Sequence, residues 1–306
     1  MATTAIAVTG LRKSYGDQVV LDGIDLAVQQ GTVFALLGPN GAGKTTTVHI
    51  LSTLIHADGG QATLAGYDLN GEAGMVREVI GVTGQYSAVD KLLTGRENLK
   101  LMADLYHLGR ARARARIEEL LGQFGLTEAA GKLAATYSGG MQRKLDLAMT
   151  LVSNPQIIFL DEPTTGLDPR SRRTMWQIVR DLSGSGVTVF LTTQYLEEAD
   201  QLADQVALLD HGTLIAQGTP EELKRMIPGG HIRLTFADVS ALRSAEEVIA
   251  RPGRADPEEL TLVVPTSSVP ELRGILTILD QNGVDPAEVT VHTPDLDDVF
   301  LALTSN

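Results

Sequence analysis

Hydrophobic residues follow two patterns along this chain. Continuous apolar runs lie within residues 32–37, 156–163 and 186–193 and are bounded by Gly, Pro or Asp. Such runs are typical of central parallel strands that are buried on both faces of a sheet. Between the last two runs, residues 170–186 have the periodicity of a helix, which predicts a strand-helix-strand crossover. The pattern therefore predicts an α/β core.

The segments around this core have other patterns. Residues 5–37 read as short strands separated by Gly and Asp turns, and a helix should run from Lys44 to about Leu54. Residues from about 88 to 155 carry helical periodicity interrupted by Gly and Pro. We therefore expect a mostly α-helical subdomain inserted between strands of the core.

A Pro/Gly break at residues 227–230 predicts a domain boundary. Beyond it, strand and helix patterns alternate as far as the segment LDDVFLALT at residues 296–304. We expect a main domain over residues 1–226 and a small C-terminal α+β accessory domain over residues 227–306.

Composition excludes several classes of function. The 306 residues carry a formal net charge of -13, which opposes binding to nucleic acid, and no cysteine is present, which excludes disulfides and thiolate metal sites. No apolar run approaches the ~18 residues that span a bilayer, and the N-terminus lacks the pattern of a signal peptide. We expect a chain that is neither exported nor membrane-spanning by itself.

The segment LLGPNGAGKTTT contains the motif G-x-x-x-x-G-K-[ST] directly after an apolar strand and at the start of a helix, which is the context this phosphate-binding motif requires. Backbone N–H groups and the helix dipole would hold phosphate oxygens. Lys44 would bridge two phosphates, and the Thr45 hydroxyl would bind Mg²⁺. The expected ATP contacts are Gly38, Pro39, Asn40, Gly41, Ala42, Gly43, Lys44, Thr45 and Thr46.

Two acids follow the buried run that ends at residue 161. Asp161 would hold Mg²⁺, and Glu162 would polarise the attacking water as a general base. Acids at strand ends also cap helices. Because ligands of open α/β sheets bind at the carboxyl ends of the strands, the phosphate motif favours the catalytic interpretation.

The motifs between these two sites narrow the family. YSGGMQRKL at residues 137–145 precedes IIFLDEPTTGLDP at the spacing of an ATP-binding-cassette signature, and VTGQYSAVDKLLTGRENL lies upstream. With these motifs the chain resembles the ATP-binding subunits of ABC transporters, and most of all the daunorubicin/doxorubicin-exporter type. The resemblance covers essentially the whole chain. It implies an ABC ATPase fold, with a parallel-sheet core, an antiparallel β subdomain and an α-helical subdomain.

The resemblance also implies roles for single residues. Tyr15 would stack on adenine, Gln85 would reach Mg²⁺ and the attacking water, and Asp168 would line a dimer interface. The helix N-terminus at the signature would meet the γ-phosphate bound by a second copy, so that each ATP lies between two chains. The residues expected at the nucleotide by resemblance are Tyr15, Gln85, Ser138, Gly139, Gly140, Gln142 and Asp168.

Gln194 departs from the family pattern, because most relatives have histidine after the LTT segment. Its amide can donate to a phosphate oxygen but cannot become cationic as imidazole can. We expect Gln194 to sense the γ-phosphate while Glu162 performs the acid–base chemistry with Lys44 at the phosphates.

The function expected from these motifs is ATP hydrolysis that drives a separate membrane permease, with a homodimer at the cytoplasmic face of the membrane and export of a drug or lipid-like compound. Two alternatives stay open at this point. One is a soluble ABC ATPase that acts on ribosomes or DNA, and the other is a regulatory module with low turnover. The expected cofactors are ATP and Mg²⁺, and no nucleic acid is expected as a partner.

Overall fold

The computed structural model describes residues 3–84, 87–227, 230–266, 269–292 and 294–304. The chain forms two compact units, residues 1–220 and 221–306. The units divide just before the Pro/Gly break, and a domain boundary at residue 226 stays a prediction. Over the described ranges, none of the helices combines the length and apolarity needed to cross a bilayer.

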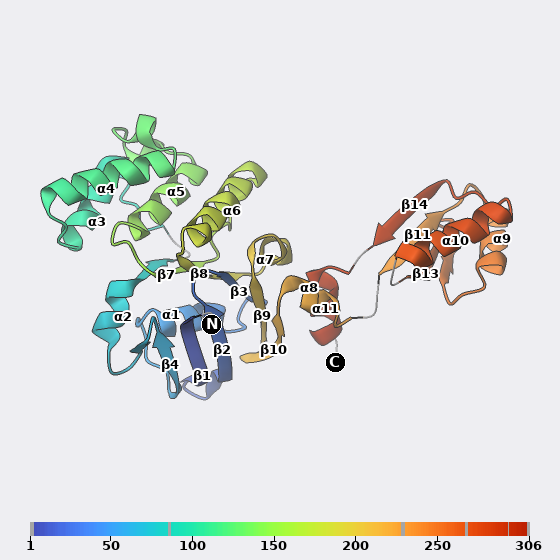
Figure 1. Ribbon diagram of the computed structural model, residues 1–306, viewed down its shortest axis with the longest axis horizontal. Helices are drawn as coiled ribbons and strands as arrows, with labels where there is room; N and C mark the ends of the chain where they lie inside the picture. The colour runs from blue at the N-terminus through green and yellow to red at the C-terminus, as the bar shows by residue number, and fades with distance from the viewer. Residues whose placement is uncertain (1–2, 85–86, 228–229, 267–268, 293, 305–306) are drawn as a thin grey trace. The chain divides into compact units, whose positions relative to one another are not determined.

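A six-stranded sheet forms the centre of the first unit (Figure 1). Its strand order is β10-β9-β3-β8-β7-β6, and all neighbours are parallel except β9 and β10. The predicted parallel core is therefore confirmed. The strands are β3 (Val33–Leu37), β6 (Ile80–Thr83), β7 (Ile157–Asp161), β8 (Thr188–Thr193), β9 (Gln205–Asp210) and β10 (Thr213–Gly218).

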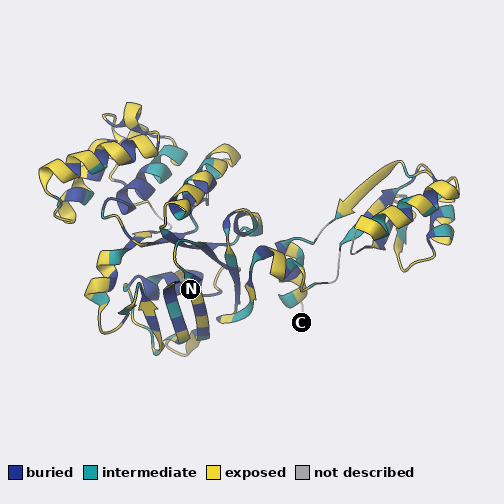
Figure 2. Cartoon of the chain, viewed as in Figure 1, coloured by how far each residue is buried: buried dark blue, intermediate teal, exposed yellow. Residues whose placement is uncertain are grey.

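Every residue of β3, β7 and β8 is buried (Figure 2), as their continuous apolar sequences require. The rings of Phe34 and Phe190 stack with their centroids 5.2 Å apart, and Phe159 lies 5.5 Å from Phe190. These contacts fix three neighbouring strands side by side. The helices that follow them are α1 (Lys44–Leu51), α6 (Pro169–Gly184) and α7 (Leu196–Leu202).

Helix α1 begins at Lys44 as predicted but ends at Leu51, before the expected Leu54. The helix stops because Thr53 adopts a left-handed backbone with φ of 63°. Helix α6 confirms the predicted crossover between β7 and β8, and its N-terminus carries Pro169 at a favoured position.

A second, antiparallel sheet has the order β2-β1-β4-β5 and shares one hydrophobic core with the six-stranded sheet. The expectation of short strands was wrong here, because the first two strands each run for 12 residues. Gly10 and Gly23 have positive φ and lie at a register shift, so they bend the strands without ending them. The elements are β1 (Thr4–Tyr15), β2 (Gln18–Gln29), β4 (Gly59–Leu64), β5 (Tyr67–Asp68) and α2 (Ala73–Val79).

The helical subdomain is confirmed between β6 and β7 (Figure 1). Helix α3 begins with a capping box, in which Thr94 and Glu97 each bond the other's backbone N–H. The described helices here are α3 (Gly95–Leu105), α4 (Arg110–Gln123) and α5 (Gly139–Thr150), with 3₁₀ turns at Thr127–Ala129 and Ala134–Thr136.

The second unit is a small α+β fold with its own hydrophobic core. Its antiparallel sheet has the order β12-β13-β11-β14. The short strand β12 was not predicted, because its three residues are polar or small. The elements are α8 (Pro220–Lys224), β11 (His231–Thr235), α9 (Val239–Ile249), β12 (Arg254–Asp256), β13 (Thr261–Pro265), α10 (Val269–Gln281), β14 (Glu288–His292) and α11 (Leu296–Thr304).

Candidate active site

The phosphate-binding loop connects the carboxyl end of β3 to the N-terminus of α1, as the motif requires. No side chain caps this helix. The first N–H groups of α1 are therefore available to an anion, and the helix dipole adds to their attraction.

Two glycines of the loop are required by close approach to neighbouring chain segments. A Cβ on Gly38 would lie 2.2 Å from the carbonyl oxygen of Leu209, and a Cβ on Gly43 would lie 2.6 Å from the side chain of Leu21. Gly43 also has a φ of 109°, a backbone conformation that residues with side chains rarely adopt. The loop is thus held against β9 and β2 by contacts that only glycine permits.

Lys44 is 5% exposed and lies inside the loop. Its ammonium group donates to the carbonyl oxygens of Gly38 at 2.8 Å and Pro39 at 3.1 Å. It also lies 3.8 Å from a carboxylate oxygen of Glu162. The pKa of Lys44 lies below its usual value, because the effect of burial outweighs the attraction of Glu162 and Asp161, which raise it.

Asp161 ends β7 and is 2% exposed. Its carboxylate accepts hydrogen bonds from the hydroxyl of Thr45 at 3.0 Å and from the hydroxyl of Thr192 at 2.5 Å. The structure therefore brings together the two predicted magnesium ligands that it describes. A hydroxyl and a carboxylate oxygen side by side are hard oxygen donors of the kind Mg²⁺ prefers.

Glu162 follows directly and has a left-handed backbone with φ of 48°. This unusual backbone is held because its N–H lies 3.1 Å from the Thr192 hydroxyl and 3.2 Å from the Thr192 carbonyl oxygen. The Thr165 hydroxyl donates to the carboxylate of Glu162 at 3.2 Å. Strained residues of this kind persist where surrounding contacts over-determine them, often at functional sites.

Gln194 comes directly after β8, which lies between β3 and β7 in the sheet. In the register of these strands Leu37 pairs with Thr193, and Asp161 pairs with Thr192. Gln194 therefore belongs to the same sheet edge as the phosphate-binding loop and the two acids, and its side chain is half-buried.

Tyr15 ends β1 and is 52% exposed, with the Lys13 ammonium 5.4 Å from the centre of its ring. An exposed ring leaves a face free for stacking. Gln85 lies outside the described residues, so its contacts remain a prediction.

The signature residues begin helix α5. The Ser138 hydroxyl accepts a hydrogen bond from the N–H of Met141 at 3.3 Å, so Ser138 caps the helix. Gln142 donates backward to the carbonyl oxygens of Ala134 and Tyr137. Its amide therefore supports the loop before the helix, and a nucleotide contact by Gln142 stays a prediction.

Asp168 caps α6 by accepting from the N–H groups of Arg170 and Ser171, each at 3.0 Å. The Ser171 hydroxyl also donates to it at 2.6 Å, and these bonds lower the pKa of Asp168. A Cβ on Gly140 would lie 2.6 Å from the same hydroxyl. The signature and the segment around Asp168 are thus close neighbours in one chain.

Two residues that contact the acids, Thr192 and Arg143, were not predicted from the sequence motifs. Thr192 forms hydrogen bonds with both Asp161 and Glu162. The sequence signal for Thr192 was a polar residue near the end of a fully buried strand. Arg143 donates to main-chain carbonyl oxygens of Asp161 and Pro163. Its signal was a polar stripe of Arg143, Asp146 and Thr150 on one face of the signature helix.

The carboxyl ends of the parallel strands carry a glycine-rich loop and a buried lysine after β3 and an acid on β7, two strands away, and this arrangement defines a P-loop ATPase. The ABC transporter family profile matches residues 21–165. The chain belongs to the family of ATP-binding subunits of ABC transporters, and it is an ATPase.

Full-length relatives support this assignment. The chain is 48% identical to the daunorubicin resistance ATP-binding protein DrrA3 of Streptomyces coeruleorubidus, over 100% of this chain and 98% of that protein. It is 44% identical to the doxorubicin resistance ATP-binding protein DrrA of Mycobacterium tuberculosis, over 99% and 94%. It is 38% identical to the Nod factor export ATP-binding protein I of Ralstonia nicotianae, over 99% and 94%.

A solved structure of an ATP-binding subunit of an ABC transporter is also similar, with a TM-score of 0.65 and 28% identity over 72% of this chain and 92% of that one. The sequence resemblance and the transporter interpretation are confirmed, in preference to a soluble ABC ATPase. Family membership implies nucleotide binding and a separate membrane permease as partner.

Replacing Thr192 by Val keeps the shape of the side chain and removes its two hydrogen bonds to the acids. We expect kcat for ATP hydrolysis to fall at least about tenfold, because each bond to a charged or buried group contributes about 1–3 kcal/mol. The matched control is Thr193→Val, since Thr193 is also buried but bonds the N–H of Tyr195. Equal kcat values for the two variants would contradict a role of Thr192 in the site.

Proposed function

We propose that this chain binds MgATP at residues 38–46, that two copies close around the nucleotides, and that hydrolysis drives a separate permease that exports a drug or lipid-like compound. One observation carries this proposal: Lys44, Asp161 and Glu162 meet at a single sheet edge. They provide the ammonium, the metal ligand and the base that phosphoryl transfer to water requires.

Magnesium fits the donor set around Asp161. In the described part of the chain, no group of three or more His, Asp or Glu side chains could hold a metal. Mg²⁺ commonly binds one or two protein oxygens together with substrate phosphates. Thr45 and Asp161 would hold it here, with Gln85 as a further ligand. When bound, the ion would neutralise developing charge on the phosphates.

Glu162 would take a proton from the attacking water. One of its carboxylate oxygens lies 3.8 Å from the ammonium group of Lys44. Because we assign Lys44 to the phosphates, the carboxylate of Glu162 would lie close to the bound ATP. Gln194 would donate its amide N–H to the γ-phosphate from the strand between the loop and the acids. The amide then positions the phosphate without titrating.

The second copy completes the site. No hydrogen bond or ion pair among the described residues joins Ser138, Gly139 or Gly140 to residues 38–46 of the same chain. The N-terminus of α5 has free N–H groups and a favourable dipole, so it suits the γ-phosphate of ATP bound to another copy. Asp168, next to Gly140, would lie at the same dimer interface, and Tyr15 would stack on the adenine.

The transported class is inferred from the names of relatives. Two of them are daunorubicin or doxorubicin resistance ATP-binding proteins, and a third is a Nod factor export ATP-binding protein. These names favour export of a drug or lipid-like compound. The chain would then act at the cytoplasmic face of the membrane, held there by its permease.

A groove of about 820 Å³ is a suitable place for the permease to bind. It lies between α2, the turn from α3 to α4, and residues 152–154 after the signature helix. A partner in this groove would contact the far end of the helix whose N-terminus we assign to ATP. Arg77, Arg112 and Arg116 line it, with Glu78 and Glu119.

Glu162→Gln should reduce ATP turnover by at least about 100-fold, because the amide cannot accept a proton from water. ATP should then hold the variant as a dimer. Light scattering after gel filtration with MgATP would detect this species, and EDTA should prevent it if Mg²⁺ is required. Unchanged turnover would refute the role of Glu162, and a strict monomer under saturating MgATP would refute the shared site.

Gln194→Ala should slow hydrolysis about 10- to 100-fold, since one hydrogen bond to a charged group contributes about 1.5–3 kcal/mol. The control is Gln201→Ala, an exposed glutamine on the following helix. Steady-state rates at saturating MgATP test this prediction. A rate equal to that of the control would show that the amide makes no useful contact.

Arg112→Glu should weaken recovery of the permease with this subunit, because it reverses an exposed charge in the groove. The matched control is Arg114→Glu, which makes the same change on the same helix outside the groove lining. The measurement is the amount of permease that co-purifies with each variant from membranes. Equal recovery with both variants would place the permease contact elsewhere.

A further inference from the structure

Arg143 is a nearly buried cation on the signature helix. Its side chain is 10% exposed, and its guanidinium donates to the carbonyl oxygen of Pro163 at 2.9 Å and of Asp161 at 3.3 Å. The carbonyl oxygen of Glu162 lies 3.5 Å away. One side chain therefore contacts three successive peptide groups at the end of β7.

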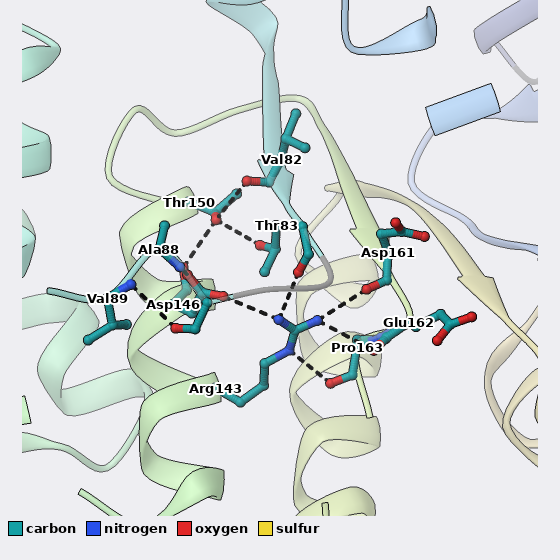
Figure 3. Close-up of polar contacts among 12 residues, drawn as sticks. Val82, Thr83, Ala88, Val89, Arg143, Asp146, Thr150, Asp161, Glu162 and Pro163 are labelled. Carbon is teal, nitrogen blue, oxygen red and sulfur yellow. Dashed lines mark hydrogen bonds and ion pairs between the residues drawn. The ribbon is translucent and has the colours of Figure 1, made fainter. Parts of the chain in front are cut away.

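The geometry of these bonds separates Arg143 from the reacting groups. Figure 3 shows the guanidinium against the main chain at Asp161 and Glu162, while both carboxyl groups point away from it. Arg143 thus holds the backbone from which the two acids project. It acts on the side of the peptide opposite to Thr192, which bonds the N–H of Glu162.

The same guanidinium binds a third part of the chain. It donates to the carbonyl oxygen of Gly84 at 2.9 Å and to the carboxylate of Asp146 at 3.2 Å. Asp146 is 4% exposed and accepts the N–H of Ala88 at 3.0 Å. The pair of Arg143 and Asp146 therefore attaches both Gly84 and Ala88 to the signature helix.

The attachment continues one turn further along α5. The hydroxyls of Thr83 and Thr150 share a hydrogen bond of 2.8 Å, and Thr150 also bonds the carbonyl oxygen of Asp146 at 3.1 Å (Figure 3). This face of the helix is polar and buried. Such networks are retained where every member is satisfied, and they fix one arrangement of the segments that they join.

A guanidinium suits this position better than an ammonium group. Its five N–H donors lie in a rigid plane and can serve several acceptors at once. Here they serve carbonyl oxygens from two chain segments and one carboxylate. Lysine could keep the ion pair with Asp146, but it could not reach this set of acceptors together.

We propose that Arg143, oriented by Asp146, is a positioning residue that couples the signature helix to the backbone of Asp161 and Glu162. This inference rests on the proposed roles of those two acids. A displacement of the N-terminus of α5 by the facing copy would reach the two acids and Gly84 through this guanidinium, and Ala88 through Asp146. The residue thereby links closure of the dimer to the orientation of the base.

The test compares Arg143→Lys, Arg143→Gln and Asp146→Asn in the full-length chain with its co-purified permease. Arg96→Lys is the control, because Arg96 forms an exposed ion pair with Glu118 on the same subdomain. For Arg143→Lys we expect kcat to fall at least about tenfold while KM for MgATP changes less than about twofold. Thermal unfolding and binding of a fluorescent ATP analogue should match the control.

The effects of the single substitutions on kcat should also be non-additive. Because the pair acts as a unit, the double variant Arg143→Gln with Asp146→Asn should lose no more kcat than the more affected single variant. If Arg143→Gln unfolds at the assay temperature, Asp146→Asn carries the comparison, since its amide oxygen can still accept from Ala88. Full activity of both Arg143→Lys and Asp146→Asn would overturn the inference.

Glu162→Gln, measured in parallel, separates this inference from the proposed function. If Glu162→Gln loses turnover while Arg143→Lys and Asp146→Asn both keep it, only the positioning role fails. If Glu162→Gln keeps normal turnover, the assignment of the base fails and the inference fails with it.

Discussion

The candidate site depends on the parallel pairing of three buried strands, β3, β8 and β7. Strands in a sheet lie about 4.8 Å apart, so adjacent parallel strands deliver the groups that follow them to one small region. The pairing of Asp161 with Thr192 sets the acid beside the hydroxyl that orients it. The phosphate-binding loop begins one strand away. Without this register, Lys44, the two acids and Gln194 would not lie close together.

Much of this arrangement could be predicted from the sequence, because its causes are local. Continuous apolar runs identified the central strands, and the glycine motif located Lys44 and Thr45. Contacts that arise from tertiary packing could not be predicted in the same way. Gly38 and Gly43 match a phosphate motif, yet the space around them is limited by Leu209 and Leu21 from distant strands. Gly10 and Gly23 looked like turns, but cross-strand pairing carries the strands through them.

The polar face of helix α5 illustrates the same limit. Arg143 and Asp146 lie three residues apart on one helix, which by itself is typical of an exposed ion pair. Their partners are carbonyl oxygens and an N–H group from segments far along the chain, so their burial is visible only after folding. A buried charge is tolerated where such partners surround it. In the roles that we propose, the signature helix would bind an anion at its N-terminus and hold the backbone of the two acids with one side.

The left-handed backbone of Glu162 has a further consequence. For a residue with a side chain, this conformation costs about 1–2 kcal/mol relative to the right-handed region, and glycine would avoid most of that cost. Glycine would also remove the carboxylate. The fold is therefore less stable than it could be at the position to which we assign the base. Selection for stability alone would remove this backbone strain, whereas selection for activity would keep it.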